Sequence, residues 1–114
     1  MPTLKIHTNV SVSAADRSQL LASASRTVAE LLGKPERYVM VLLEPPAAMA
    51  FAGTEQPAAY LELKSLALPE DQTAALSAAL TQWVSTWLKV SADRLYIEFS
   101  SPPRHLFGFN GGTF

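Results

Sequence analysis

The second residue of the chain, Pro2, is the one whose position could give it chemistry of its own. It follows Met1, and a residue as small as proline normally allows an initiator methionine to be removed. The chain would then begin with a secondary amine, and an N-terminal amine has an unperturbed pKa of about 7.7–8.0. Burial disfavours the charged form and lowers this pKa further. A neutral amine near pH 7 suits a general base that removes protons from carbon, whereas the plainer interpretation makes Pro2 an ordinary second residue.

The residues that follow predict the burial that such a base needs. Residues 3–8 alternate between apolar and polar with a period of two, which is typical of a half-buried strand. A proline is tolerated at the first residue of a strand, where its missing N–H matters least. Ser13 and Asp16 then form a helix-start signal, and Gly33 forms a helix stop. The sequence therefore predicts a strand and a helix directly after the candidate base.

The rest of the chain repeats this strand–helix–strand order at an offset of about 57 residues. A second helix is predicted to open at Pro69 and to carry an apolar stripe that ends at Leu88. The apolar segment 47–53 is expected to form a tight connection or a short edge strand. Further strands are predicted at residues 38–43, 58–66 and 94–99.

We interpret the repeat as two βαβ units of one sheet, at about residues 2–45 and 58–101. Together with an aromatic tail, residues 102–114, which is expected to pair or pack, they form a single domain of residues 1–114. The strand at 38–43 is a near-continuous apolar run, which is typical of a strand buried on both faces. If both helices cover one face of the sheet, the other face is expected to be apolar and bare, and a symmetric oligomer is its expected cover.

The composition excludes several classes of function. The 114 residues carry a net charge of −1 with few, scattered basic residues, so no nucleic-acid partner is expected. The sequence has no apolar run of the length of a membrane span and no secretory signal, which predicts a cytoplasmic protein without a membrane partner. The absence of cysteine excludes thiol nucleophiles. His7 and His105 lie far apart without ligand spacing, so neither a metal site nor a metal cofactor is expected.

Taken together, the motifs resemble the macrophage migration inhibitory factor (MIF) family of the tautomerase superfamily. No single motif is specific, but their order and spacing match over all 114 residues. The matching segments are Met1-Pro2, Thr8-Asn9-Val10, Gly33-Lys34-Pro35, Met49-Ala50-Phe51 with Gly53, Ser65, Asp93-Arg94-Leu95-Tyr96-Ile97, and Gly108, Asn110, Thr113 and Phe114 of the tail.

The resemblance implies a fold of the α/β (α+β) class, with a duplicated βαβ unit. Its four-stranded mixed sheet would carry two helices on one face, and the chain would form a homotrimer with short edge strands. The implied activity is a cofactor-free keto–enol tautomerisation of phenylpyruvate-like 2-oxo acids, of the phenylpyruvate tautomerase or dopachrome isomerase type. The substrate pocket would lie at a subunit interface.

The resemblance also implies roles for particular residues. Pro2 would be the catalytic general base, and Lys34 would hold the substrate carboxylate and help to lower the pKa of the amine. The backbone at Leu66 would line the pocket and donate a hydrogen bond. Tyr96, from the neighbouring subunit, would contact the substrate. The plainer alternatives are a solvated Lys34 that meets a helix dipole and a Tyr96 that belongs to the core.

The remaining implied site residues differ from those of the family. Phe107 and Phe109 would form the aromatic mouth, although their alternation about Gly108 fits a plain edge strand equally well. Glu98 stands where mammalian members carry an asparagine that shapes the site. A carboxylate there would raise the pKa of the amine and repel a carboxylate substrate, so we expect a shifted preference and modest activity on phenylpyruvate.

Two further functions stay open at this level. Vertebrate relatives act as secreted signalling proteins that leave cells without a signal segment, so a cytokine-like interaction module with weak or relict tautomerase activity is the alternative to an enzyme. The Cys-x-x-Cys of mammalian members is absent from the matching strand at residues 58–61, which excludes a thiol oxidoreductase. A structural trimer with a relict pocket is the third possibility.

Overall fold

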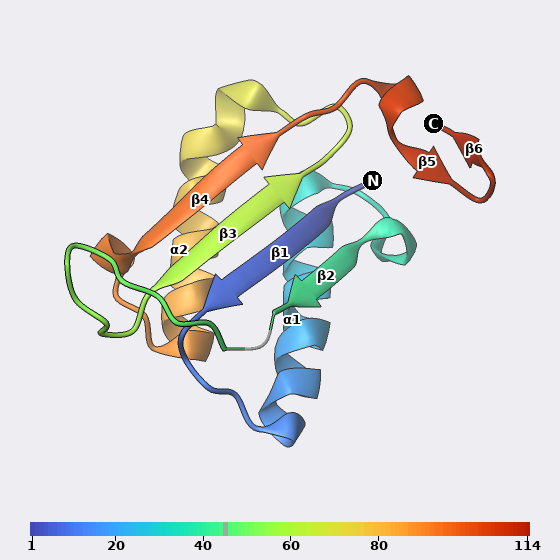
Figure 1. Cartoon of the computed structure of the whole chain (residues 1–114). Helices are drawn as coiled ribbons and strands as arrows, with labels where there is room; N and C mark the ends of the chain where they lie inside the picture. Colours follow the sequence, from blue (N-terminus) through green and yellow to red (C-terminus); the bar gives the residue numbers. More distant parts are fainter. Residues whose placement is uncertain (45) are drawn as a thin grey trace.

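The computed structural model describes residues 1–44 and 46–114, so Pro45, at the end of the first predicted repeat, lies outside the described residues. The main elements of the first half are β1 (Thr3–Thr8), α1 (Ala14–Leu32), the 3₁₀ turn η1 (Glu36–Tyr38) and β2 (Met40–Leu43). Those of the second half are β3 (Ala59–Lys64), η2 (Glu70–Gln72), α2 (Thr73–Leu88), η3 (Ala92–Arg94) and β4 (Leu95–Ser100). The tail adds η4 (Arg104–Leu106), β5 (Gly108–Phe109) and β6 (Gly112–Thr113) (Figure 1).

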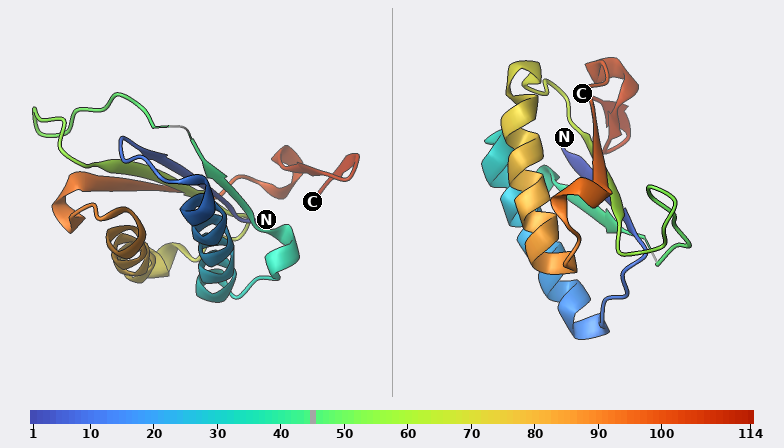
Figure 2. Two further views of the ribbon diagram at one scale, coloured as in Figure 1. Left: turned by 90° about the horizontal axis from the view of Figure 1, so that it is seen from below. Right: turned by 90° about the vertical axis from the view of Figure 1, so that its left-hand side faces the viewer.

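The four main strands form one mixed sheet in the order β2-β1-β3-β4. Each half of the chain is a βαβ unit whose two strands are parallel, and the halves join through the antiparallel pair of β1 and β3. Both helices lie on the same face of this sheet (Figure 2). The predicted class, a duplicated βαβ fold with a mixed sheet and two helices on one face, is therefore confirmed.

The core lies between the sheet and the two helices. Every second residue of the central strands points into it, including Leu4, Ile6, Leu61 and Leu63, each at most 1 % exposed. The predicted helix stripes face these strands, because residues three and four apart in a helix share one face. Their buried members are Leu20, Ala24 and Val28 in α1, and Leu76, Leu80, Trp83, Val84 and Leu88 in α2.

The ends of α1 follow the predicted signals. The hydroxyl of Ser13 accepts a hydrogen bond from the N–H of Asp16 at 3.2 Å, as an N-cap does. At the other end Gly33 adopts the left-handed conformation with φ 62°, and the N–H of Lys34 then donates to the carbonyl of Ala29 at 3.0 Å. This turn fixes the direction in which the chain leaves the helix and so where Lys34 lies.

Several predicted boundaries are wrong by a few residues. The strand predicted at 38–43 starts only at Met40, because Tyr38 belongs to a 3₁₀ turn. The strand predicted at 58–66 ends at Lys64, and the second helix is preceded by the turn η2 rather than starting beside Pro69. Arg94, predicted to begin the last strand, likewise closes the turn η3.

The environment predicted for the strand at 38–43 is also wrong. It was expected to be buried on both faces, whereas β2 is an edge strand and the Met40 side chain is 58 % exposed. A parallel strand is buried on both faces only when helices cover both faces, and here both helices cover one. The side chains of β2 that point away from the helices therefore have no layer above them.

The face of the sheet without helices is largely polar, which contradicts the prediction of a bare apolar face. We call it the open face, and its side chains on the three strands β1, β3 and β4 are Thr3, Lys5, His7, Tyr60, Glu62, Lys64, Tyr96, Glu98 and Ser100. The apolar residues of these strands belong mostly to the other face, because side chains alternate along a strand. An oligomer therefore cannot be argued from an apolar open face, and the homotrimer stays a prediction.

Candidate active site

The candidate base lies at one end of the sheet. Pro2 is buried directly before β1, and its carbonyl accepts a hydrogen bond from the N–H of Met40 at 3.0 Å. Thr3 pairs with Lys64, the last residue of β3, so the start of the chain lies where β3 and β4 end (Figure 1). The segment that follows β3 therefore passes beside the N-terminal amine.

The side chain of Lys34 contacts the segment that follows β3. Its ammonium donates to the hydroxyl of buried Ser65 at 2.9 Å and to the carbonyl of Leu66. The Lys34 side chain is half-buried, and the two hydrogen bonds hold it where its charge acts on the terminal amine. The structure thus brings Pro2, Lys34 and Leu66 together, with Leu66 as an acceptor for Lys34. The predicted donation from the Leu66 backbone to a substrate stays a prediction.

The surroundings favour the neutral form of the terminal amine. With Met1 in place this amine belongs to Met1, and its pKa is lowered first by desolvation, then by the charge and the hydrogen bond of Lys34, and last by the charge of Arg104. The pKa of Lys34 is itself lowered, chiefly by desolvation and further by Arg104, although its hydrogen bond to the amine acts in the opposite direction. A lowered pKa favours the neutral amine, which is the state that a general base requires.

An aromatic cluster lies next to this group. Tyr38 is two residues from Met40, whose N–H bonds the Pro2 carbonyl, and its ring lies 5.6 Å from that of Phe109. The ring of Phe114 lies 5.3 Å from that of Phe109 and 5.9 Å from that of Phe107. The hairpin of β5 and β6 folds the tail back to make these contacts. The cluster includes both predicted mouth residues.

Three residues of this region were not singled out by the sequence analysis as site residues. Tyr38 was placed in a strand, and Phe114 entered only as a family match, because nothing in the sequence shows that the tail returns to η1. Arg104 lies in an exposed turn of the tail, and its charge reaches both the amine and Lys34. The only sequence signal for Tyr38 is its position four residues after Lys34.

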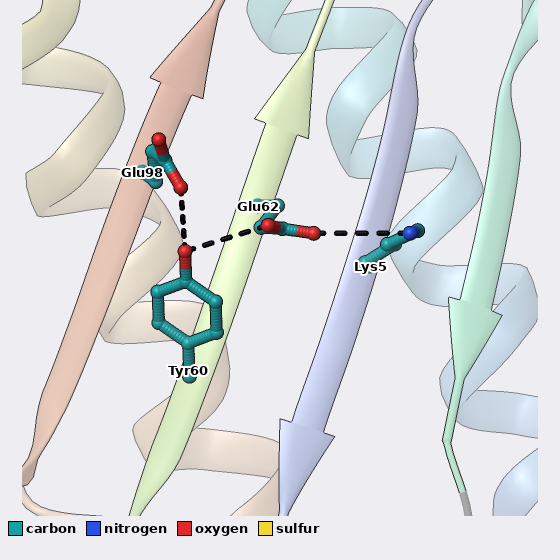
Figure 3. Close-up of polar contacts among 4 residues, drawn as sticks. All are labelled: Lys5, Tyr60, Glu62 and Glu98. Carbon is teal, nitrogen blue, oxygen red and sulfur yellow. Dashed lines mark hydrogen bonds and ion pairs between the residues drawn. The ribbon is translucent and has the colours of Figure 1, made fainter.

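Tyr96 and Glu98 lie elsewhere on the same chain. Tyr96 shares a row of the sheet with His7, and His7 is five residues from Pro2, or roughly 16 Å along the strand. The Tyr96 side chain is 67 % exposed, and its ring packs against that of Phe51 at 4.9 Å. Glu98 instead accepts a hydrogen bond from the hydroxyl of Tyr60 at 2.6 Å (Figure 3). Within one chain, neither residue takes part in the Pro2 group.

A hollow of about 280 Å³ opens on the open face beside Pro2. It is lined by Thr3, Lys5, Glu62, Lys64, Pro102, Leu106 and Phe107. Within residues 1–44 and 46–114, no group of three or more His, Cys, Asp or Glu side chains is arranged to hold a metal ion. None of the helices in these two ranges combines the length and apolar character needed to span a membrane.

The duplicated βαβ fold is that of the tautomerase superfamily, to which the MIF family belongs. The family model "Macrophage migration inhibitory factor (MIF)" matches residues 1–114. The MIF homolog of Brugia malayi is 36 % identical over 115 residues, covering 100 % of this chain and 99 % of the relative. The MIF homologue structure from Prochlorococcus marinus superposes with a TM-score of 0.90 at 40 % identity, covering 98 % of each chain. The MIF structure from Trichinella spiralis superposes with a TM-score of 0.90 at 32 % identity, covering 98 % of this chain and 99 % of that chain. The chain belongs to the macrophage migration inhibitory factor family.

Proposed function

We propose that this chain, once Met1 is removed, is a cofactor-free keto–enol tautomerase of phenylpyruvate-like 2-oxo acids with Pro2 as its general base. One observation carries the proposal: the N-terminal amine lies partly desolvated at the start of β1, where the charge of Lys34, held by Ser65 and Leu66, acts on it. These surroundings lower the pKa of the amine in the presence of Met1, and removal of Met1 would transfer the amine to Pro2, which is more deeply buried.

The proposed reaction moves one proton and needs no redox partner. The neutral amine of Pro2 takes a proton from the carbon next to the ketone, the C–H electron pair becomes the C=C bond of the enol, and the C=O π pair moves to oxygen. The protonated amine then returns the proton to that oxygen. In the reverse direction Pro2 takes the enol O–H proton and returns it to carbon. Lys34 binds the substrate carboxylate through a charge-assisted hydrogen bond, which fixes the carbon against the amine.

We further propose that residues 1–114 form one domain that assembles as a homotrimer, with each site at a subunit interface. A neighbouring subunit would supply Tyr96 and Glu98, which are too far from Pro2 in the same chain. The 67 % exposure of the Tyr96 side chain supports this arrangement, because a large aromatic ring at an open edge of a sheet is available to a second copy. Phe107 and Phe109 would form the mouth of the pocket.

An experiment on the N-terminus tests the proposal. One added residue before Pro2, as in a Met-Ala-Pro start, would move the amine by about 3.8 Å and convert the Pro2 nitrogen into an amide. With the N-terminus confirmed by intact mass, we expect phenylpyruvate ketonisation by the protein that starts at Pro2 and a loss to background in the extended protein. A variant with Ala added after Phe114 is the matched control and should keep its rate.

Equal rates for the extended and the Pro2-terminated protein would refute Pro2 as the base. Background rates for both, with an intact trimer by sedimentation, would instead favour the cytokine-like interaction module. A cytoplasmic location is part of the same proposal and is tested by cell fractionation.

A further inference from the structure

The hollow at the Pro2 end of the open face is lined by Lys64 as well as by the ion pair of Lys5 and Glu62. Its floor is the open face at the ends of β1 and β3, and its wall is the tail at Pro102, Leu106 and Phe107. Lys64 is the last residue of β3 and pairs across the strands with Thr3, the residue that follows Pro2. Both Thr3 and Lys64 line the hollow, so it reaches the residue that follows the proposed base.

The neighbouring carboxylates are engaged by other side chains. Glu62 pairs with the ammonium of Lys5 at 3.9 Å and accepts a weak hydrogen bond from the hydroxyl of Tyr60 at 3.4 Å. Glu98 accepts from the same hydroxyl at 2.6 Å, so each carboxylate has one oxygen bonded to Tyr60 (Figure 3). Both carboxylates also line a small hollow with Lys64. Among residues 1–44 and 46–114, Lys5 and Glu62 form the only ion pair within 4.0 Å, which leaves Lys64 without one.

Positive charge therefore accumulates toward the Pro2 end of the open face. Within one chain, Lys5, Lys64, Glu62 and Glu98 sum to zero, but the two carboxylates lie one row further from Pro2 than Lys64 does. The Glu98 that a neighbouring subunit would bring to the site would face both Lys34 and Lys64 there. Beyond this end lie Lys34 and Arg104, whose charges reach the terminal amine. Paired Cα atoms of antiparallel strands are about 5 Å apart, so a small molecule held at Pro2 can also reach the Lys64 ammonium.

We propose that Lys64 is a specificity residue that forms a second anion subsite, and that the preferred substrates are 2-oxo acids with a second carboxylate. This rests on the proposed function of the Pro2 site. Lys34 takes the carboxylate next to the ketone, the carbon chain lies against Leu106 and Phe107, and Lys64 takes the distal carboxylate. An aromatic monoanion such as phenylpyruvate uses the same apolar wall but leaves Lys64 unpaired.

The test compares two substrates of equal carbon number, 2-oxopentanedioate and 2-oxopentanoate, which differ by the distal carboxylate. Exchange of their C3 protons for deuterium in D₂O, followed by NMR, measures the proposed proton transfer for both. We expect the protein that starts at Pro2 to favour the dianion in kcat/KM by about tenfold, the size of one charge-assisted contact. Lys64→Gln should remove most of this ratio by raising KM for the dianion, with kcat little changed.

Lys89→Gln is the matched control, because Lys89 is an exposed lysine at the C-terminus of α2, outside the residues of the hollow, and should leave the ratio unchanged. The inference would be overturned if kcat/KM for 2-oxopentanedioate did not exceed that for 2-oxopentanoate in the parent protein, or if the preference survived Lys64→Gln. Turnover of phenylpyruvate in the same experiment would leave the proposed function standing. No exchange of any of the three substrates would instead refute the proposed function and the inference with it.

Discussion

Arg94 holds the segment between β2 and β3 in place, which makes its replacement informative. Its guanidinium donates to four backbone carbonyls: Phe51 at 3.0 Å, Thr54 at 3.3 Å, Gln56 at 3.0 Å and Pro57 at 2.9 Å. It also lies 5.4 Å from the ring centre of Phe51, the ring against which Tyr96 packs. The planar guanidinium of Arg94 therefore supports Phe51, and through Phe51 it supports Tyr96, the residue proposed to reach the site of a neighbouring subunit.

Arg94→Lys keeps the charge but replaces the fork by a single ammonium. If lysine retains one of the four bonds, three are lost, and each contributes about 0.5–1.5 kcal/mol in net terms. The carbonyls are accessible to water, so we take the lower end of that range, about 1.5 kcal/mol in total. For a chain of this size, that corresponds to a fall in Tm of about 6 °C.

Thermal unfolding followed by circular dichroism measures this change, with Arg26→Lys as the matched control because Arg26 is exposed on α1. We also expect Arg94→Lys to raise KM more than it lowers kcat, since Tyr96 would lose the support of Phe51. A Tm within about 2 °C of the parent would refute the reasoning, because it would mean that the three lost hydrogen bonds contribute almost nothing net.

Three other predictions concern charge. Lys34→Ala should raise the pKa of the acid limb of the pH–rate profile, because Lys34 lowers the pKa of the amine, and should reduce kcat/KM by about 10- to 100-fold; an unmoved limb would count against this role. Glu98→Gln should shift that limb to lower pH, since a neighbouring carboxylate stabilises the protonated amine, and an unchanged limb would exclude Glu98 from the site. The hydrogen bond to Glu98 raises the pKa of Tyr60 to about 12. In an ultraviolet titration of the tyrosines, Tyr60→Phe should therefore remove the phenol ionisation that occurs at the highest pH; loss of an ionisation near the ordinary tyrosine pKa would contradict the hydrogen bond to Glu98.

Much of the fold was predictable because its signals are local. Alternation over residues 3–8 and the capping residues Ser13 and Gly33 act within a few positions, and β1 and α1 form where these signals place them. The repeat offset also explains why the 3₁₀ turns η1 and η3 precede the second strand of each unit. The identities of the turn residues were visible in the sequence, but their conformation was not.

The errors arose where the result depends on distant parts of the chain. The run at 38–43 is apolar enough for a buried strand, yet only the sheet order makes β2 an edge. The convergence of Tyr38 with Phe114 depends on the path of the tail after β4, which no local pattern encodes. Pro2 and Lys34 were predicted to act together and lie at the same end of the sheet, whereas Tyr96 and Glu98 lie away from Pro2 within one chain, and their part in the site rests on the proposed trimer.

The most direct test of the central claim is the pH dependence of phenylpyruvate ketonisation by protein whose terminus is confirmed as Pro2. The account predicts that kcat/KM rises with pH through a pKa below the ordinary N-terminal value of about 8, because burial and Lys34 favour the neutral amine. A rate that is independent of pH across this range, or that rises only through a pKa at or above the ordinary value, would contradict it.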